Sequence, residues 1–404
     1  MTIGVGGKTA EQALATLSDM TAGAVPIARG EYQMRIDNAQ SLMKEAGINA
    51  LYLNAGTNLY YFTGTRWRPS ERMVGAVLLQ TGAPHYIGPA FEEGTIRQFM
   101  LIEGDVQGWE EHETPFHLVK EILNASGVTS GQIGLDESTP FFISDGIAKA
   151  APEFECVNGA MITAKCRMIK SKAELALMTR AKEMTLAVHK ATATIMHEGI
   201  TTTEVGAFID AAHRKVGASA GSFFKIILFG PDSSYPHGVK TPKALSTGDM
   251  ILIDTGCQLH DYISDITRSY VYGDPTDKQR HVWDAEKSAQ AKAFEAAQTG
   301  VRCGDVDLAA RAELELHGFG PGYATPGLPH RTGHGIGLEI HEWPYLNWGD
   351  NTKLATGMCF SNEPMICVYG EFGVRLEDHF YMNDDGPVWF TEPSHSIDDP
   401  FNGV

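Results

Sequence analysis

Residues 333–342 have the sequence GHGIGLEIHE, in which two histidines, His334 and His341, lie seven residues apart. The three glycines beside and between them have no side chain, so the backbone of this segment can pass close to a ligand or a metal ion. A histidine in a glycine-rich turn is also a common loop residue. Whether this segment belongs to a functional site therefore depends on acidic residues elsewhere in the chain.

The composition is typical of a soluble globular protein, because 43% of the 404 residues are hydrophobic and 20% are charged. This length is sufficient for two domains, each with its own core. The formal net charge of −18 argues against a protein that binds nucleic acid or an anionic membrane surface, since either partner would require a basic face.

The six cysteines are scattered without any Cys-x-x-Cys pair, which predicts neither a thiolate zinc site nor a disulfide framework. Residues 1–30 lack a basic region followed by an apolar run, and no later segment has about 18 uninterrupted apolar residues. We therefore expect a cytoplasmic protein without a membrane-spanning segment.

Apolar spacing divides the chain into two regions. In residues 1–160, short helix and strand patterns alternate, which predicts a three-layer α/β domain. Residues 161–404 are expected to form a second domain with longer helices. Its first helix is expected at 171–197 and starts with the capping box Ser171-Lys172-Ala173-Glu174.

The second region contains an internal repeat. Helix-breaking glycines recur at the same offset of eighteen residues, as Gly199 with Gly217 and Gly300 with Gly318. Each pair follows a long helical segment and precedes an apolar β-hairpin, at 250–272 in the first copy and 358–381 in the second. This pattern indicates a duplicated helix-helix-hairpin unit.

Acidic side chains interrupt both predicted hairpins. Asp254 ends a buried strand and Asp265 lies in the return strand, whereas Glu363 and Glu377 occupy the second hairpin. A buried carboxylate is costly unless it is paired or binds a cation, and four of them together would repel one another. We therefore expect these carboxylates and His334 to form a metal site.

The ligand types indicate which metal this site would hold. Several oxygens and one nitrogen disfavour zinc in a thiolate cage and suit Mn²⁺, Co²⁺ or Fe²⁺. Four carboxylates are too many for one ion, and they fit two cations about 3.5–4 Å apart that share acids and a hydroxide as bridges. We expect two divalent cations with Mn²⁺ as the physiological metal, and Co²⁺, Zn²⁺ or Fe²⁺ as alternatives.

With these residues and the motifs Asn362-Glu363-Pro364 and Arg375-Leu376-Glu377-Asp378, the chain resembles the pita-bread metallopeptidases, in particular their prolidase and aminopeptidase P branch. The five candidate ligands are separated by 11, 69, 29 and 14 residues, as in that family. The resemblance implies an α/β (α+β) fold. A pita-bread catalytic domain of two related helix-helix-hairpin halves is expected at 161–404, and a smaller three-layer creatinase-like domain at 1–160.

The resemblance also implies roles for individual residues. Two metal ions would be held by Asp254, Asp265, His334, Glu363 and Glu377. Glu363 would in addition deprotonate the bridging water and later protonate the leaving nitrogen, while His341 would stabilise the tetrahedral oxyanion. His237 would contact the substrate near the scissile bond, although a histidine after Pro236 is otherwise a turn residue. Arg375 would be a partner of the ligating carboxylates.

Two positions depart from the prolidase pattern, and both concern substrate binding. Phe223 stands where the family often has a tyrosine hydroxyl, and it cannot donate a hydrogen bond. Tyr345 stands where microbial prolidases have an arginine for the free carboxylate of a dipeptide, and it supplies no charge. A strict dipeptide preference is therefore open, with Arg331, Arg66 and Arg68 as the candidate substitutes.

The leading hypothesis is metal-dependent hydrolysis of the Xaa-Pro bond by a prolidase-like Xaa-Pro dipeptidase, whose substrate is a small peptide with proline at P1′. An Xaa-Pro aminopeptidase acting on longer peptides is the first alternative. A creatinase, an ectoine hydrolase or a dimethylsulfoniopropionate lyase of the same fold is the second, although metal-free members have lost ligands that this chain retains. A non-catalytic binding protein is the third. The resemblance further implies a homodimer or homotetramer built through the N-terminal domain.

Overall fold

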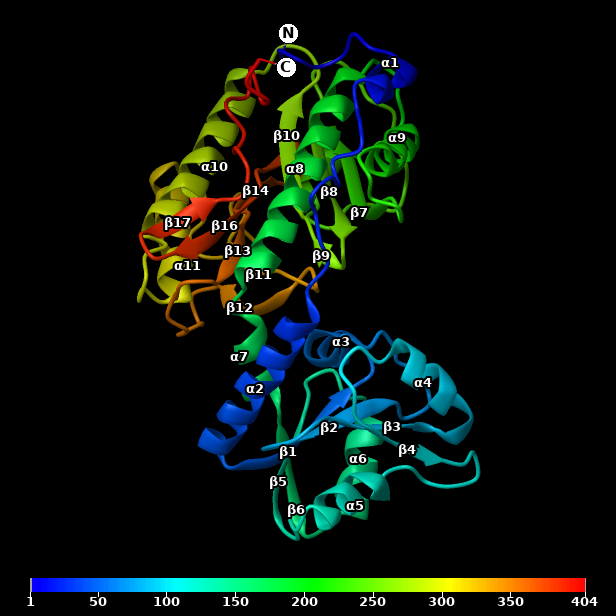
Figure 1. Cartoon of the computed structure of the whole chain (residues 1–404). Coiled ribbons are helices and arrows are strands. Elements are labelled where there is room, and N and C mark those ends of the chain that lie inside the picture. Colours follow the sequence, from blue (N-terminus) through cyan, green and yellow to red (C-terminus); the bar gives the residue numbers. More distant parts are fainter. Residues whose placement is uncertain (1, 404) are drawn as a thin grey trace. The chain divides into compact units, whose positions relative to one another are not determined.

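The computed structural model describes residues 2–403, which form two compact units (Figure 1). The smaller unit comprises Ile27–Arg167, and the larger unit comprises the described residues from Met168 onward together with those up to Pro26. The division expected from the sequence, at 1–160 and 161–404, differs in assigning the first residues to the smaller unit. Backbone hydrogen bonds connect the residues before Ile27 to the larger unit. Gly6 donates to the carbonyl of Ala193, and Lys8 donates to that of Thr194.

The smaller unit is a six-stranded sheet with helices on both faces, as the alternating sequence pattern predicts. Its strands are β1 (Ile48–Asn54), β2 (Gly75–Leu79), β3 (His85–Pro89), β4 (Asp105–Trp109), β5 (Gly131–Leu135) and β6 (Phe154–Asn158). Its helices are α2 (Arg29–Ala46), α3 (Thr57–Thr63), α4 (Glu93–Phe99), α5 (His117–Ala125), α6 (Phe141–Ala150) and α7 (Ala160–Arg167), with a 3₁₀ turn η1 at Ala90–Glu92.

The strand order in this sheet is β4-β3-β2-β1-β5-β6. Successive side chains of a strand point to opposite faces. Ala50 and Tyr52 of β1 accordingly join the core cluster formed with α5 and α6, and Leu51 and Leu53 point to the other face, where α2 packs. The sheet is therefore the middle of three layers.

The larger unit contains five helices and eleven strands within the described residues. The helices are α1 (Ala10–Ala15), α8 (Lys172–Thr194), α9 (Thr202–Lys215), α10 (Asp277–Ala296) and α11 (Cys303–Leu316), with a 3₁₀ turn η2 at Gly230–Ser234. The first half contributes β7 (Ser222–Phe229), β8 (Met250–Leu259), β9 (Tyr262–Ile263) and β10 (Ile266–Val271). The second half contributes β11 (Gly333–Gly335), β12 (Glu342–Leu346), β13 (Cys359–Asn362), β14 (Met365–Val368), β15 (Phe372–Arg375), β16 (Asp378–Asn383) and β17 (Gly386–Trp389).

The duplication predicted from the glycine spacing is present in the structure. Each half has a long helix, a second helix of 14 residues and an antiparallel sheet. Gly199 and Gly300 follow the long helices with φ of 85° in both cases, and Gly217 and Gly318 follow the second helices with φ of 107° and 88°. Only glycine adopts this left-handed region readily. Gly199 donates to the carbonyl of Leu245, and Gly300 makes the corresponding bond to Leu354, each at 2.8 Å.

Side-chain caps define where the long helices begin. Ser171 and Glu174 form the predicted capping box at the start of α8, and Thr276 and Gln279 form an equivalent box at the start of α10. Figure 1 shows α8 running beside β8, while α10 and α11 flank the second sheet. Among residues 2–403, no helix is long and apolar enough to cross a membrane.

The two halves are joined where their sheets meet. The strands of the first sheet lie in the order β10-β8-β7, and those of the second in the order β12-β11-β13-β16-β17. Thr267 of β10 and Glu377 form an isolated bridge between the halves, with the Glu377 N–H donating to the Thr267 carbonyl at 3.0 Å. The two hairpins are therefore adjacent at their acidic residues. Asp254 lies in β8, whereas Asp265, expected in the return strand, lies just before β10, and Glu363 and Glu377 also lie between strands.

Candidate metal centre

Asp265, His334 and Glu377 come together from separate elements of the larger unit. Asp265 lies between β9 and β10, His334 is in β11, and Glu377 lies between β15 and β16. One ligand atom from each lies within 4.8 Å of the others, and all three side chains are buried. These are three of the five residues expected from the sequence to hold metal ions.

Glu363, the fourth expected ligand, contacts the histidine of this cluster. Its Oε1 lies 3.1 Å from His334 Nε2 and accepts a hydrogen bond from the Ser361 hydroxyl. Burial raises the pKa of the Glu363 carboxyl, but His334, His330 and Arg375 outweigh this effect and lower it below its usual value. Glu363 is therefore an ionised carboxylate at neutral pH.

Asp254, the fifth expected ligand, is connected to the cluster through Arg375. The Arg375 guanidinium donates to Asp254 Oδ2 at 2.5 Å and to Thr267 Oγ1 at 3.0 Å. Thr267 in turn donates to Glu377 Oε2 at 2.8 Å. One guanidinium and one hydroxyl thus hold an acid from each half of the larger unit in place.

The carboxylates of this cluster repel one another. Burial raises the pKa of Asp265 well above its usual value, and the charges of Glu377, Asp254 and Glu363 raise it further. Burial likewise raises the pKa of Glu377, with added repulsion from Glu363 and Asp254. The pKa of Asp254 is raised by burial although Arg375 opposes the change. Cations bound among these groups would offset both the cost of burying the negative charges and their mutual repulsion.

The unpaired atoms of the cluster match the donor set that divalent cations need. Among the described residues, Asp254 Oδ1, Asp265 Oδ1 and Glu377 Oε1 are buried without a hydrogen-bond partner. His334 Nδ1 lies 3.0 Å from the Gly335 carbonyl, which assigns the ring proton to Nδ1 and leaves Nε2 as an acceptor. Nε2 and the Glu363 carboxylate then face each other as two acceptors, and only a shared cation or proton can satisfy both.

A cavity of about 370 Å³ lies beside the cluster. It is lined by Pro236, His237, Tyr323, His330, Arg331, His341, Glu363 and Arg375. The ring centroids of His334 and His341 are 4.3 Å apart, with an interplanar angle of 78°. Partial burial, together with the charges of His334 and Arg331, lowers the pKa of His341 to about 4. A neutral imidazole therefore borders the cavity at pH 7.

Comparisons with known proteins agree with this geometry. The family model described as metallopeptidase family M24 matches residues 176–384, and that of the creatinase/prolidase N-terminal domain matches residues 35–169. The chain belongs to metallopeptidase family M24. Members of this family depend on two metal ions, and the cluster of Asp265, His334 and Glu377 is a possible site for them.

The relatives of this M24 metallopeptidase include enzymes with dipeptidase names. A putative dipeptidase of Bacillus subtilis is 32% identical over 89% of this chain and 97% of its own length. An Xaa-Pro dipeptidase of Lactobacillus delbrueckii is 28% identical over 90% of this chain and 98% of its own length. The crystal structure of dipeptidase PepE from Mycobacterium ulcerans superposes with a TM-score of 0.86 at 29% identity, covering 92% of this chain and 99% of that one. The expected fold, with its pita-bread and creatinase-like parts, is confirmed.

The remaining residues predicted for the M24 site lie in different places. His237 lines the cavity, and Tyr345 lies next to it with its ring 4.3 Å from the Arg331 guanidinium carbon. Phe223 is 46% exposed and is not among the side chains that line the cavity. Arg66 donates to the Tyr60 hydroxyl within the smaller unit.

Two histidines near the M24 site were not found by the sequence analysis. His330 lines the cavity, and His379 is buried with its Nε2 3.9 Å from Glu377 Oε1. Burial lowers the pKa of His379 well below its usual value, and Lys182 and His334 lower it further. The position of His330 four residues before His334 is a signal that could have found it, whereas a single histidine in the buried strand β16 has the pattern of an ordinary core residue.

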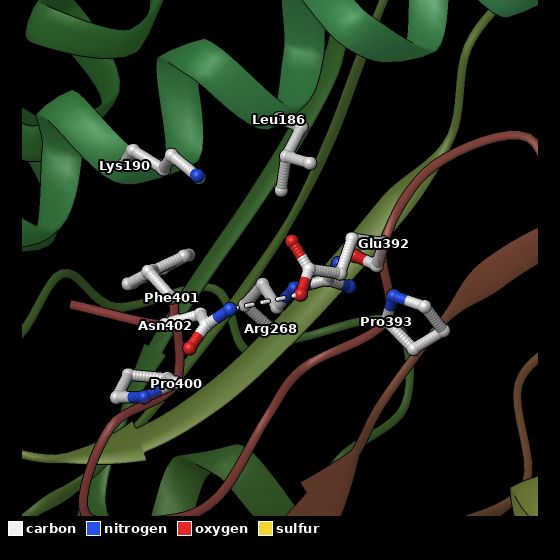
Figure 2. Close-up of a pocket in the computed structure, with 8 residues that line it drawn as sticks. All are labelled: Leu186, Lys190, Arg268, Glu392, Pro393, Pro400, Phe401 and Asn402. Carbon is white, nitrogen blue, oxygen red and sulfur yellow. Dashed lines mark hydrogen bonds between the residues drawn. The ribbon is translucent and has the colours of Figure 1, made fainter. Parts of the chain in front are cut away.

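A second cavity, drawn in Figure 2, has about 10 Å³ and is formed by the C-terminal segment over Arg268. This volume holds about one water molecule, so it is too small for a peptide. Two of its lining residues are hydrogen-bonded, with Asn402 donating to Glu392 Oε1 at 3.1 Å. Arg268 forms an ion pair with Asp378 at 2.7 Å and donates to the Glu392 carbonyl. Its side chain therefore links the C-terminal segment to β16.

Proposed function

We propose that this M24 metallopeptidase hydrolyses the Xaa-Pro bond of dipeptides as an Xaa-Pro dipeptidase. The observation that carries the proposal is the set of Asp254, Asp265, His334 and Glu377, all buried, with the partly buried Glu363, beside a cavity of about 370 Å³. The names of the relatives support the same reaction, since several are Xaa-Pro dipeptidases.

In this proposal, these five residues would hold two divalent cations, with Mn²⁺ as the physiological metal. A site rich in carboxylate oxygens with one imidazole suits Mn²⁺ better than thiolate-seeking metals. When bound, the cations would supply Lewis acidity and lower the pKa of a water molecule.

The residues of the chain then act on the proton and on the substrate. The ionised carboxylate of Glu363 borders the cavity, where it accepts the proton of the attacking water and returns it to the proline nitrogen that leaves. The neutral ring of His341 donates its N–H to the oxygen that becomes negative in the transition state. His237, which also lines the cavity, contacts the substrate close to the scissile bond.

Arg375 acts through the ligands and not on the substrate. Its hydrogen bonds to Asp254, to Thr267 and to the Pro236 carbonyl engage all three nitrogens of the guanidinium. It keeps the Asp254 carboxylate oriented and connects it to the segment that carries His237. Partners of this kind orient metal ligands and tune their affinity.

Metal removal tests the proposed function. The protein is treated with a chelator, and hydrolysis of Ala-Pro and Gly-Pro is measured before and after addition of Mn²⁺, Co²⁺, Zn²⁺ or Fe²⁺. We expect activity to vanish with the chelator and to return most fully with Mn²⁺. Full hydrolysis by the metal-free protein would refute the mechanism, and turnover of creatine or ectoine without any peptide hydrolysis would refute the substrate class.

We also propose that the protein acts in the cytoplasm as a homodimer or homotetramer that assembles through the smaller unit. All six cysteines are free thiols, which supports a reducing compartment. Large apolar side chains are exposed on the smaller unit, with Phe141 at 83% and Phe91 at 62%. Light scattering coupled to size exclusion measures the mass in solution, and a strict monomer would contradict the assembly.

A further inference from the structure

Two arginines line the cavity beside the cluster, and only one of them is engaged by the protein. Arg375 donates to Asp254 Oδ2, Thr267 Oγ1 and the Pro236 carbonyl. Within the part of the chain that the structure describes, no hydrogen bond or ion pair engages the Arg331 guanidinium, and its contact is with the ring of Tyr345. The Arg331 donors are therefore free to bind a ligand in the cavity.

The aromatic contact holds Arg331 in a defined position. Its guanidinium carbon lies 4.3 Å from the centroid of the Tyr345 ring, within the range of a cation–π interaction. Strands β11 and β12 pair His334 with Tyr345, which fixes the ring relative to the candidate ligand His334. A flat guanidinium against an aromatic ring keeps its edge of N–H groups available, which suits a planar anion.

The backbone next to Arg331 is also fixed. The hydroxyl of Thr332 donates to Asp307 Oδ1 at 2.7 Å, and its N–H bonds to the Leu346 carbonyl at 3.0 Å. On the other side, His330 Nδ1 lies 2.7 Å from the Arg331 carbonyl. Groups held in place before a ligand arrives lose little conformational entropy on binding, so this arginine is preorganised.

The charge of Arg331 differs in sign from that of the adjacent acids. A peptide with a free C-terminus brings a carboxylate into a cavity that Glu363 also borders. Like charges repel, and the side chain able to compensate the incoming carboxylate there is Arg331, because Arg375 is already paired. A guanidinium binds a carboxylate through two parallel N–H bonds.

We propose that Arg331, supported by the ring of Tyr345, binds the C-terminal carboxylate of the substrate and so selects dipeptides over longer peptides. This inference rests on the proposed function, because it assumes that a peptide is cleaved in this cavity. In a dipeptide the carboxylate is attached to the residue directly after the scissile bond. In a tripeptide a neutral amide takes its place, and Arg331 is left without its anion.

The test compares Ala-Pro with Ala-Pro amide and Ala-Pro-Ala in the Mn²⁺-loaded parent enzyme and in Arg331→Met. We expect the parent to favour Ala-Pro in kcat/KM by about 10- to 100-fold, as for a hydrogen-bonded charged group. In Arg331→Met the value for Ala-Pro should fall by a similar factor, mainly through KM, while that for the amide stays within about threefold. Arg331→Lys keeps the charge without the planar fork and should show an intermediate preference.

Further variants separate the anion-binding role from a general structural one. Tyr345→Leu removes the supporting ring and should reduce the preference for Ala-Pro by a smaller factor than Arg331→Met. Arg302→Met is the matched control, because Arg302 is an exposed arginine of the same unit that pairs with Asp305. It should leave all three rates unchanged. An equal loss on Ala-Pro and on its amide in Arg331→Met would overturn the proposal.

Binding without turnover supplies a second readout. Calorimetric titration of the metal-free protein uses a reduced-bond analogue of Ala-Pro and the C-terminal amide of this analogue. We expect the parent to bind the carboxylate form about 10-fold more tightly or better, and Arg331→Met to bind both forms alike. Equal affinity of the parent for both forms would overturn the proposal independently of catalysis.

Failure of this inference can be distinguished from failure of the proposed function. Ala-Ala and Ala-Ala amide are measured in parallel with the proline peptides. Cleavage of Ala-Pro and its amide at equal rates by the parent refutes the role of Arg331 and leaves Xaa-Pro hydrolysis intact. No cleavage of proline peptides, together with an Arg331-dependent preference for Ala-Ala over its amide, refutes the Xaa-Pro function and supports the role of Arg331.

Discussion

Lys170 Nζ lies 3.0 Å from Glu342 Oε2, and both side chains are almost completely buried. Lys170 precedes helix α8 of the first half, whereas Glu342 begins strand β12 of the second. Glu342 Oε1 accepts the backbone N–H groups of Leu338 and Glu339 at 3.0 and 3.1 Å. One carboxylate thus orders the turn between the two histidines of residues 333–342, and Lys170 compensates its charge.

Replacing Lys170 with methionine is expected to destabilise the protein by about 3–5 kcal/mol, because it removes the ammonium that compensates a buried carboxylate. Without its counter-charge, Glu342 should no longer order the turn between His334 and His341. Because this turn positions His341, kcat should fall as well. Urea denaturation and kcat on Ala-Pro measure the two effects. The double variant Lys170→Met with Glu342→Gln should recover part of the stability, since no buried charge is left.

Lys292→Met is the matched control for this pair, because Lys292 forms an exposed ion pair with Glu295. Exposed pairs contribute little to stability, so no measurable change is expected. If Lys170→Met and Lys292→Met unfold at the same urea concentration as the parent, the buried pair does not have the role given to it here.

Arg375→Lys should weaken metal binding by about 10- to 100-fold, as expected when a group that orients a metal ligand is lost. A lysine has its donors on one nitrogen and cannot reach the three acceptors that Arg375 bonds from three separate nitrogens. Calorimetric titration of the metal-free protein with Mn²⁺ measures the affinity. The control is Arg280→Lys, because Arg280 forms an exposed ion pair with Asp398. An unchanged Mn²⁺ affinity in Arg375→Lys would show that Arg375 does not orient the metal ligands.

The larger unit could be predicted from the sequence because its repeat rests on backbone requirements. Gly199 and Gly300 have φ of 85° where each long helix ends, and such positions favour glycine strongly enough to be visible in one sequence. The acids were conspicuous for the opposite reason, because a carboxylate such as Asp265 interrupts an apolar stretch of sequence.

Other features left no such signal. The described residues before Pro26 bind the larger unit through backbone groups, such as the bond from Gly6 to Ala193, and these do not depend on side-chain type. Arg331 could only be named as one candidate among three arginines, since its position depends on the pairing of β11 with β12. Tertiary pairing of this kind is not encoded in local spacing.

Acid is expected to destabilise the protein partly through His213 of α9. Burial lowers the pKa of this histidine to about 4, whereas an unfolded histidine has a pKa of about 6.5. Between these values the unfolded chain binds more protons than the folded one, so stability falls as the pH drops. The contribution lost is at most about 3 kcal/mol.

His213→Gln should reduce this dependence on pH, since glutamine does not titrate. Its amide can replace the contacts to Thr185 and Ser222. The measurement is the free energy of unfolding in urea between pH 7 and about pH 4.5 in metal-free protein, a range set by the two pKa values. His197→Gln, at an exposed position, should keep the slope of the parent. Identical slopes for both variants would exclude His213 as the source.

Glu363→Gln tests the proton transfer assigned to this residue. Glutamine has nearly the same shape as glutamate but cannot accept the proton of an attacking water, so kcat on Ala-Pro should fall by about 10²- to 10⁴-fold. The fold should persist, because Glu363 is only partly buried, an amide oxygen can still accept from the Ser361 hydroxyl, and the amide N–H can donate to His334 Nε2.

Metal content decides how such a loss is read. Glu363 is both a proposed ligand and the proposed base, so bound Mn²⁺ is quantified in the same preparation, with Glu371→Gln as an exposed control. A large fall in kcat with full Mn²⁺ content assigns proton transfer to Glu363. A fall that excess Mn²⁺ reverses assigns only the ligand role, because the missing activity then follows metal occupancy. Retention of most of kcat at full occupancy would show that another group carries the proton, and the neutral His341 beside it would be the next residue to replace.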